Sequence, residues 1–312
     1  MIVCCGIAAQ AGASAYPTRP VTLVVPYTPG TGIDIIARIL AQNLTARWGQ
    51  GVVVDNKPGA SGSIGTEFVA KAGPDGHVLL VTATSFATNA ALSRTLRYDP
   101  VNSFVPVSLL ANGTMSLAVS NNTPAASVRE LVALAKERPG QLNYASSGNG
   151  TPQHLTMELF KLEAGIDLTH IPYKGTAGAV NDVVGGRVNA MFLPIHTALP
   201  FVRQGEMRML AVVANERSAV VPDVPTMAEA GFPGVQVGNW YGLFAPAGTP
   251  SAIVAKLNSD VNAVLELTDV KEALARQGLA PLAGPPERLA GLVRAELARW
   301  PRVVRAAGIH SD

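Results

Sequence analysis

A loop between a strand and a helix offers backbone amides to an anion, and the first such loop in this chain is 26–34. It follows the apolar run Val21–Val25 and precedes a segment in which apolar residues recur at helical spacing. Amides at a helix N-terminus point outward at the positive end of the helix dipole, so they bind an anion without a cationic side chain. We therefore expect Gly30, Thr31 and Gly32 to bind a negatively charged group.

A second loop, 143–152, repeats this arrangement of strand, glycine-bearing turn and helix. Thr151 occupies the expected N-cap position, and the proline after it suits the first position of a helix. The candidate ligand-binding residues of this loop and of the following helix are Ser146, Ser147, Gly148, Thr151 and His154. Two anion-binding loops that lie far apart in the chain predict one acidic ligand held from two sides.

Four further residues are candidates for the same site. Asp34 stands in the first turn of its helix, where a carboxylate complements the helix dipole or contacts a cationic group of the ligand. Tyr173 and Lys174 end another strand-like run, and strand ends of an α/β sheet face a shared cleft. Lys174 is either solvated there or attracts an acidic ligand. Thr84, which follows a third strand-like run, completes the ligand-binding set.

Catalytic and cofactor-binding interpretations of these motifs have less support. Gly30 and Gly32 have the spacing that opens a dinucleotide fingerprint, but Ile35 occupies the position of its third glycine. Ser147 and His154 could supply the nucleophile and base of a hydrolase, but no third group is evident to orient the base. The five histidines show no metal-ligand spacing. The sequence therefore predicts a binding protein without catalytic residues, metal or cofactor.

A further glycine-rich connection, 56–65, also joins a strand-like run to a helix-like run. No G-x-S-x-G pattern passes through Ser61 or Ser63, so this connection does not match a nucleophile elbow. Its glycines either serve tight turns alone or bring the loop close to the cleft.

The composition of the 312-residue chain is typical of a folded protein with two domains. Hydrophobic residues make up 48% of the chain and charged residues 15%, so it can bury a large core. A net charge of +2 gives no electrostatic footprint for nucleic acid, and the body of the chain contains no apolar run long enough to cross a bilayer. We expect a monomer.

Alternating strand-like and helix-like runs predict an α/β fold with two domains, each a mainly parallel sheet flanked by helices. A boundary at 112–113 and a return within 240–248 place residues 16–112 and 244–312 in a discontinuous first domain and residues 113–243 in an inserted second domain. Two chain crossings form a hinge, and a cleft between two such domains is a common ligand site.

Residues 1–15 differ from the rest of the chain because they are small, apolar and uncharged. They end in Ala-Ser-Ala at 13–15, which predicts a secretory signal cleaved before Tyr16 and a periplasmic mature chain. The missing basic segment indicates a translation start further upstream; the alternatives are a segment that is not a signal and a lipid anchor on Cys5. Cleavage removes both cysteines, Cys4 and Cys5, and with them disulfide and thiolate chemistry.

Seven sequence segments follow one another along the chain. They are YPTRPV at 16–21, VVPYTPGTGIDIIAR at 24–38, VVVDNKPGA at 52–60, LNYASSGNGT at 142–151, HIPYKG at 170–175, PDVPTMAEAG at 222–231 and GLFAPAGTP at 242–250. Each alone is a weak signal, but together and in this order they are specific. Over essentially its full mature length, the chain resembles the Bug-type periplasmic solute receptors of tripartite tricarboxylate transporter systems.

The resemblance implies a two-domain clamp of the periplasmic-binding-protein type that closes on a small organic carboxylate and delivers it to membrane permease subunits. The family's first ligand loop corresponds to 29–34, its second to 146–151 together with His154, and its third to 173–175. A sensor that presents its ligand to a signalling partner is the alternative role.

Two features depart from the family's pattern. Ile33 stands where a small or hydroxylated residue is common, and Leu-Pro-Ile-His at 193–196 replaces a turn that contains an aspartate. Without that carboxylate, the resemblance implies a plain or aromatic carboxylate ligand rather than an amino acid.

Overall fold

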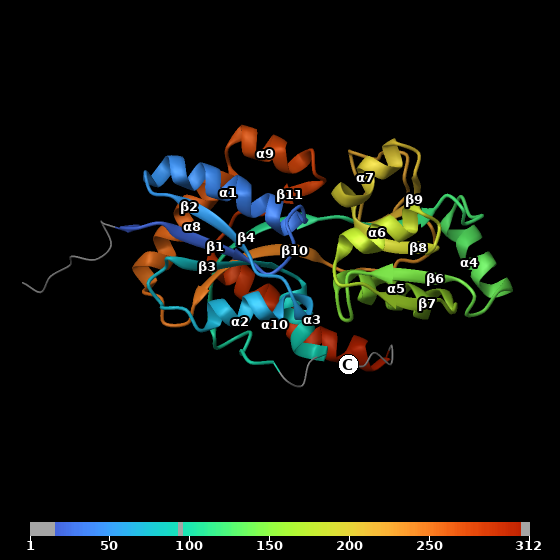
Figure 1. Ribbon diagram of the computed structural model, residues 1–312, viewed down its shortest axis with the longest axis horizontal. Helices are drawn as coiled ribbons and strands as arrows, with labels where there is room; N and C mark the ends of the chain where they lie inside the picture. The colour runs from blue at the N-terminus through green and yellow to red at the C-terminus, as the bar shows by residue number, and fades with distance from the viewer. Residues whose placement is uncertain (1–15, 93–95, 307–312) are drawn as a thin grey trace, which may run out of the picture.

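The computed structural model describes residues 16–92 and 96–306, which form two α/β halves lying side by side (Figure 1). Each half is a sheet with helices on both faces, so the predicted two-domain α/β fold is confirmed. The expected signal segment, 1–15, lies outside the described residues. None of the described helices is long and apolar enough to cross a membrane.

The first half contains a six-stranded sheet in the order β11-β4-β10-β3-β1-β2. Its strands are β1 (Val21–Val25), β2 (Val52–Asn56), β3 (Val78–Ala83), β4 (Phe104–Gly113), β10 (Asn239–Pro246) and β11 (Leu279–Pro281). The helices on one face are α1 (Gly32–Trp48), α8 (Ser251–Leu265) and α9 (Thr268–Ala275). Those on the other are α2 (Ser63–Ala70), which follows the 3-10 turn η1 (Ala60–Gly62), α3 (Ser85–Leu92) and α10 (Pro286–Ala306).

The second half contains a five-stranded sheet in the order β7-β6-β8-β5-β9. Its strands are β5 (Met115–Ser120), β6 (Asn143–Ser146), β7 (Thr169–Pro172), β8 (Ala190–Pro194) and β9 (Met207–Val213). Helices α4 (Val128–Glu137) and α5 (Pro152–Ala164) pack on one face. Helices α6 (Thr176–Val184) and α7 (Ile195–Arg203) pack on the other.

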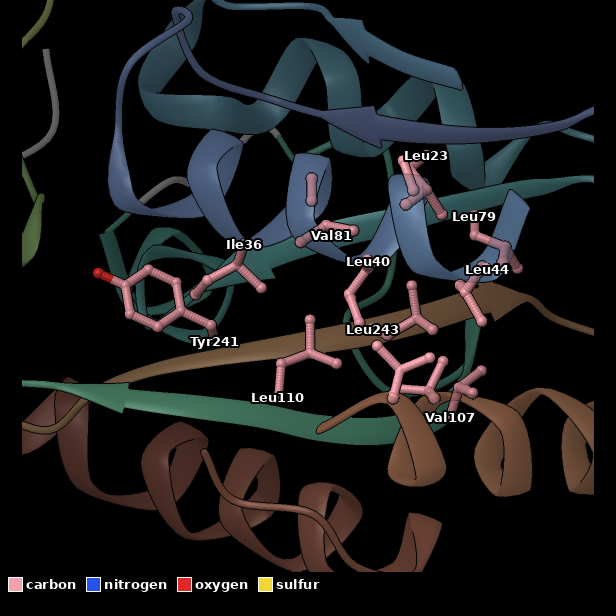
Figure 2. Close-up of a cluster of buried hydrophobic side chains, with 14 of the residues drawn as sticks. Leu23, Ile36, Leu40, Leu44, Leu79, Val81, Val107, Leu110, Tyr241 and Leu243 are labelled. Carbon is pink, nitrogen blue, oxygen red and sulfur yellow. The ribbon is translucent and has the colours of Figure 1, made fainter. Parts of the chain in front are cut away.

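The core of the first half shows how the sequence positions α1 (Figure 2). Ile36, Leu40 and Leu44 recur every four residues, so they share the helix face that packs against the sheet. Burying each such side chain stabilises the fold by about 1.5–3 kcal/mol. Tyr241 of β10 lies at the end of this cluster, with its ring near Ile36 and its hydroxyl pointing away from the aliphatic side chains. The packing therefore brings the start of α1 and the hydroxyl of Tyr241 to the same end of the sheet.

Both sheets are mixed, which corrects the expectation of mainly parallel strands. Strand β1 pairs in parallel with β2 and β3, and β6 with β7 and β8. Strand β10 is antiparallel to β3 and β4, and β5 is antiparallel to β8 and β9. The antiparallel strands adjoin the crossings between the halves, because a strand that leaves a sheet and a neighbour that returns to it run in opposite directions.

The chain crosses between the halves twice. It leaves the first sheet at the end of β4 and enters the second at β5, with only Thr114 between the two strands. It returns through Gly238 into β10. The division of the chain into a first domain of residues 16–112 and 244–312 and a second domain of residues 113–243 remains a proposal. The pairing of residues 239–243 with β3 and β4 favours placing the return crossing at Gly238 rather than at residue 244.

Candidate functional site

A cavity of about 290 Å³ lies between the two halves, and both contribute to its wall. The first half lines it with the loop before α1, the end of β3 and the start of β10. The second half lines it with the loop before α5 and the first turns of α6 and α7. The lining residues are Tyr27, Thr28, Pro29, Gly30, Thr31, Gly32, Ile33, Ala83, Ser85, Met115, Ser147, Thr151, Pro152, Gln153, Thr176, Ala177, Val180, Asn181, Pro194, His196, Thr197, Phe201, Asn239 and Tyr241.

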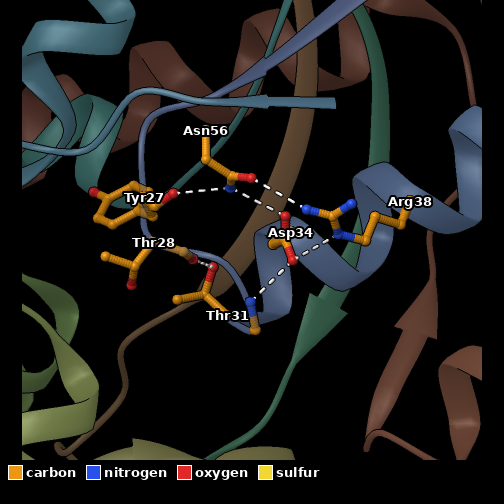
Figure 3. A network of polar contacts seen from close by, with 7 residues as sticks. Tyr27, Thr28, Thr31, Asp34, Arg38 and Asn56 are labelled. Atoms are coloured by element: carbon orange, nitrogen blue, oxygen red, sulfur yellow. Dashed lines mark hydrogen bonds and ion pairs between the residues drawn. The ribbon is translucent and has the colours of Figure 1, made fainter. Parts of the chain in front are cut away.

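Asp34 holds the first loop in shape but does not line the cavity (Figure 3). Its Oδ2 atom accepts hydrogen bonds from Gly30 N at 2.9 Å and from Arg38 Nε at 2.9 Å, and Oδ1 accepts from Asn56 Nδ2 at 3.0 Å. Burial opposes its ionisation, but the hydrogen bonds from Arg38, Gly30 and Asn56 together hold its pKa below the usual value. Both oxygens are thus engaged by the protein, which favours a structural role over contact with a cationic ligand group.

His154 plays the corresponding part in the second loop. Its Nδ1 atom accepts a hydrogen bond from Gly150 N at 3.0 Å, and its ring stacks on His170 with centroids 4.0 Å apart. Burial, assisted by the charge of Lys161, lowers the pKa of His154 to about 4, so the ring is neutral near pH 7. His154 does not line the cavity and positions the loop instead.

Two threonines, Thr31 and Thr151, are the N-cap residues of α1 and α5, but neither hydroxyl caps its helix. Thr31 Oγ1 donates to Thr28 O at 3.1 Å, and Thr151 Oγ1 donates to Gly148 O at 2.8 Å. A capping hydroxyl would accept a hydrogen bond from a first-turn amide. Because neither hydroxyl accepts from a first-turn amide, the first-turn amides of both helices stay available to a ligand in the cavity.

The third predicted loop meets the cavity two residues later than expected. The Tyr173 hydroxyl donates to Asp182 Oδ2 at 2.6 Å, and Lys174 is exposed; neither residue lines the cavity. Thr176 and Ala177, at the N-terminus of α6, line it instead. The strand ends before these residues, so the helix rather than the strand end reaches the cavity.

Three other candidates lie behind the cavity wall. Thr84 is fully buried; its hydroxyl donates to Gly238 O at 2.8 Å and accepts from Trp240 N at 3.1 Å, which ties β3 to the return crossing. Ser146 Oγ donates to Gly148 O at 3.0 Å and accepts from Gly148 N at 3.2 Å, so both residues shape their loop. Of the predicted site residues, the cavity brings together Gly30, Thr31, Gly32, Ser147 and Thr151. Their contact with a ligand stays a prediction.

The sequence interpretation did not select His196 and Tyr241, which lie directly against Gly32. A Cβ atom on Gly32 would lie 2.6 Å from His196 Cε1, 2.8 Å from His196 Nε2 and 2.8 Å from the Tyr241 hydroxyl oxygen. His196 is 8% exposed, and its Nε2 atom has no hydrogen-bond partner among the described residues. In the sequence, the departure from the family's pattern at 193–196 was the only feature that drew attention to His196. Gly32 is therefore needed for close approach of these two rings.

The wall of the cavity is electrically neutral. None of its described lining residues is Asp, Glu, Lys or Arg. Within residues 16–92 and 96–306, no group of histidine, cysteine or carboxylate side chains is placed to hold a metal ion. The N-termini of α1, α5, α6 and α7 carry partial positive charge towards this wall, which suits a small anion.

Hydrogen bonds between described residues also cross between the halves beside the cavity. Thr88 Oγ1 of α3 donates to Gly150 O at 2.9 Å, and Ser61 Oγ donates to Asn149 O at 3.1 Å. Ser61 has φ of +52°, and its own carbonyl accepts from the Tyr27 hydroxyl at 2.8 Å and from Asn89 Nδ2 at 2.8 Å. The glycine-rich connection 56–65 thus brings Ser61 to the second anion loop, and Tyr27 links it to the cavity wall.

Comparison with known proteins agrees with this geometry. Residues 36–309 match the family described as tripartite tricarboxylate transporter family receptor. The chain is 38% identical over 309 residues to BugT of Bordetella pertussis, covering 98% of this chain and 95% of that one.

Two solved structures are similar over nearly the whole chain. A protein of R. palustris with adipate has 39% identity, coverage of 95% of this chain and 99% of that one, and a TM-score of 0.91. MatC from Rhodopseudomonas palustris with bound malate has 37% identity, coverage of 93% and 100%, and a TM-score of 0.87. The chain belongs to the family of tripartite tricarboxylate transporter receptors, a family of solute-binding receptors and not of enzymes.

Proposed function

We propose that this protein is an exported receptor that binds a small organic carboxylate in the cavity between its halves and delivers it to a membrane permease of the tripartite tricarboxylate type. One observation carries the proposal: several helix N-termini converge on a cavity whose described lining residues include no Asp, Glu, Lys or Arg. Helix dipoles and first-turn amides there stabilise an anion. Bound adipate and malate in the two similar structures support a carboxylate as that anion.

The division of the ligand contacts follows from the same geometry. First-turn backbone amides of α1, beside Gly32, bind one carboxylate oxygen. The backbone amide of Gln153, in the first turn of α5, binds the same carboxylate from the other half. Neither half encloses the ligand alone, so binding favours the closed arrangement of the two halves. We expect the receptor to act as a monomer, because one chain supplies the complete cavity wall.

Calorimetry with matched ligand pairs tests the proposed function. Native mass spectrometry of protein purified without refolding identifies retained acids, and each acid is then titrated beside its primary amide, which is similar in size but uncharged. The acid should bind and raise thermal stability, by about 2.7 kcal/mol at a hundredfold excess over the Kd. The amide should bind at least tenfold more weakly. Equal affinity for acid and amide would overturn the anion site.

Export before Tyr16 is tested separately, by N-terminal sequencing of the periplasmic fraction. The expected first residue is Tyr16, whose buried hydroxyl donates to Gly76 O at 2.6 Å. An intact Met1 would contradict cleavage at this position.

A further inference from the structure

The rings of His196 and Tyr241 form a polar corner of the cavity, contributed by one residue from each half. Both approach the same point beside Gly32: His196 Nε2 and the Tyr241 oxygen each lie 2.8 Å from where a Cβ of that glycine would stand. His196 Nε2 is buried and has no partner among the described residues. An unpartnered buried polar atom is unfavourable, so a ligand group that satisfies it contributes to affinity.

The direction of hydrogen bonding at Tyr241 is set by Asn239. The amide Nδ2 of Asn239 donates to the Tyr241 oxygen at 3.0 Å. Burial raises the pKa of Tyr241, so the phenol keeps its proton near neutral pH. With its oxygen already accepting from Asn239, Tyr241 is left to donate that proton, and it requires an acceptor in the cavity.

At His196 the hydrogen bond to a ligand runs in the opposite direction, because the ring accepts where Tyr241 donates. Burial lowers the pKa of His196 to about 4, while a hydrogen bond with the backbone of Gln277 acts in the other direction. We assign this backbone bond to a ring N–H that donates to the carbonyl of Gln277, because donation by the ring is what would raise its pKa. Since Nε2 has no partner, Nδ1 carries the donated proton. The Nε2 atom of the neutral ring is therefore a hydrogen-bond acceptor.

Resting on the proposed function, we infer that this corner selects organic acids that carry a hydroxyl group on an apolar body, with the hydroxyl accepting from Tyr241 and donating to His196 Nε2. A hydroxyl both donates and accepts, whereas a second carboxylate only accepts and an ammonium group only donates. The remaining wall fits the apolar body, because Ile33, Met115 and Phe201 line the cavity. The ligand class is thus a hydroxylated aromatic or aliphatic carboxylate.

Calorimetric titration of the purified full chain with matched acids tests this inference. The aromatic series is benzoate, 3-hydroxybenzoate, 4-hydroxybenzoate and terephthalate; the aliphatic series is hexanoate, 6-hydroxyhexanoate and adipate. In at least one series, a hydroxylated acid should bind about tenfold more tightly than its parent and than the corresponding diacid. Binding of carboxylates without any preference for the hydroxyl means that water alone occupies the corner, which overturns the inference but not the proposed function. Absence of binding by every carboxylate overturns the proposed function.

Two variants locate the preference. Tyr241→Phe keeps the ring and removes the donor, and His196→Asn keeps a donor for Gln277 while removing the Nε2 acceptor. Each should reduce the preference for the hydroxylated acid over its parent from about tenfold to about twofold or less. The matched control is His77→Asn, because His77 is also buried with an unpartnered Nε2 but lies outside the cavity. A preference that survives in Tyr241→Phe, which is the variant least able to disturb folding, overturns the assignment.

Discussion

Asp34 and His154 occupy the same position in two different loops: each is the third residue of its helix and accepts a hydrogen bond from the glycine four residues earlier. The distances are 2.9 Å from Gly30 N to Asp34 Oδ2 and 3.0 Å from Gly150 N to His154 Nδ1. In both loops the residue between glycine and helix is a threonine whose hydroxyl bonds back to a carbonyl three residues earlier. An anionic acceptor and a neutral acceptor thus maintain the same loop geometry.

Replacing Asp34 with Asn should destabilise the fold in a pH-dependent way. An asparagine at this position would offer one acceptor oxygen where the carboxylate now takes three hydrogen bonds, so we expect a loss of about 1–3 kcal/mol near neutral pH. The native pKa of Asp34 lies below the usual 3.8. Its stabilisation is therefore complete above that value and disappears as pH falls through the native pKa. Urea unfolding of the wild type and of Asp34→Asn, at neutral and at acidic pH, measures the difference in their free energies of unfolding. This difference should shrink as the pH falls; a difference that stays constant contradicts the role assigned to Asp34.

Replacing Gly32 with Ala should weaken both ligand binding and the fold. The added methyl would lie 2.6 Å from His196 Cε1 and 2.8 Å from the Tyr241 oxygen, so the rings or the first turn of α1 must shift. We expect a loss of about 1–3 kcal/mol in stability and at least a tenfold weaker Kd, measured by thermal unfolding and calorimetry.

The matched control is Gly291→Ala. Gly291 lies in α10, where an added Cβ meets nothing within 4 Å. This change should raise stability by up to about 1 kcal/mol and leave affinity unaltered. Equal affinity of Gly32→Ala and wild type would contradict the close packing at the cavity.

Replacing Thr151 with Val should loosen the second loop. The change removes the hydrogen bond to Gly148 O and keeps the shape of the side chain, so it should cost about 0.5–1.5 kcal/mol in stability and reduce affinity. Thr151→Ser keeps the hydroxyl and should therefore retain most of the stability and most of the ligand affinity of the wild type. A lower melting temperature with unaltered affinity would show that Thr151 serves only the fold.

Replacing Thr88 with Val should shift the two halves towards an open arrangement. Its hydroxyl donates across the cleft to Gly150 O, so its loss should weaken ligand binding by about 2- to 13-fold. Small-angle scattering should show a larger radius of gyration for the ligand-free variant than for the ligand-free wild type.

Thr66→Val is the control for this experiment. The Thr66 hydroxyl is also buried but donates within the first half, to Gly62 O at 2.8 Å. The Thr66→Val variant should be less stable than the wild type, but its ligand affinity and its radius of gyration should be unchanged. If the two variants change affinity equally, the bond from Thr88 has no special part in closure.

The sequence predicted those parts of the cavity wall that depend on local geometry. A glycine-bearing turn before a helix places its amides by short-range geometry, so the loops around Gly32 and Thr151 were identifiable. The contacts of Asp34 and His154 within their loops were not, because a first-turn carboxylate or imidazole can face the cavity or its own backbone. His196 and Tyr241 were also missed, since only tertiary packing brings β10 and α7 against α1.

The fold shows a similar division between local and long-range information. Most strands and helices followed from apolar periodicity, but α3, α7, β10 and β11 were not predicted. Helix α3 has three alanines and one each of Ser, Thr and Asn among its eight residues and so has little periodic contrast, and α7 contains Pro200, which is typical of a helix break. The mixed pairing of the sheets depends on which strands adjoin the crossings, and strand composition does not reveal that order.

The neutral wall of the cavity also determines how a bound anion leaves. An ion pair with a lysine or arginine on one half would keep a carboxylate attached to that half after opening. Partial charges at helix ends act only over the first turn, so their attraction falls off steeply as the halves separate. None of the described lining residues carries a formal charge, so a modest opening would disperse the attraction without breaking an ion pair. Capture and discharge would then depend on the geometry of the two halves.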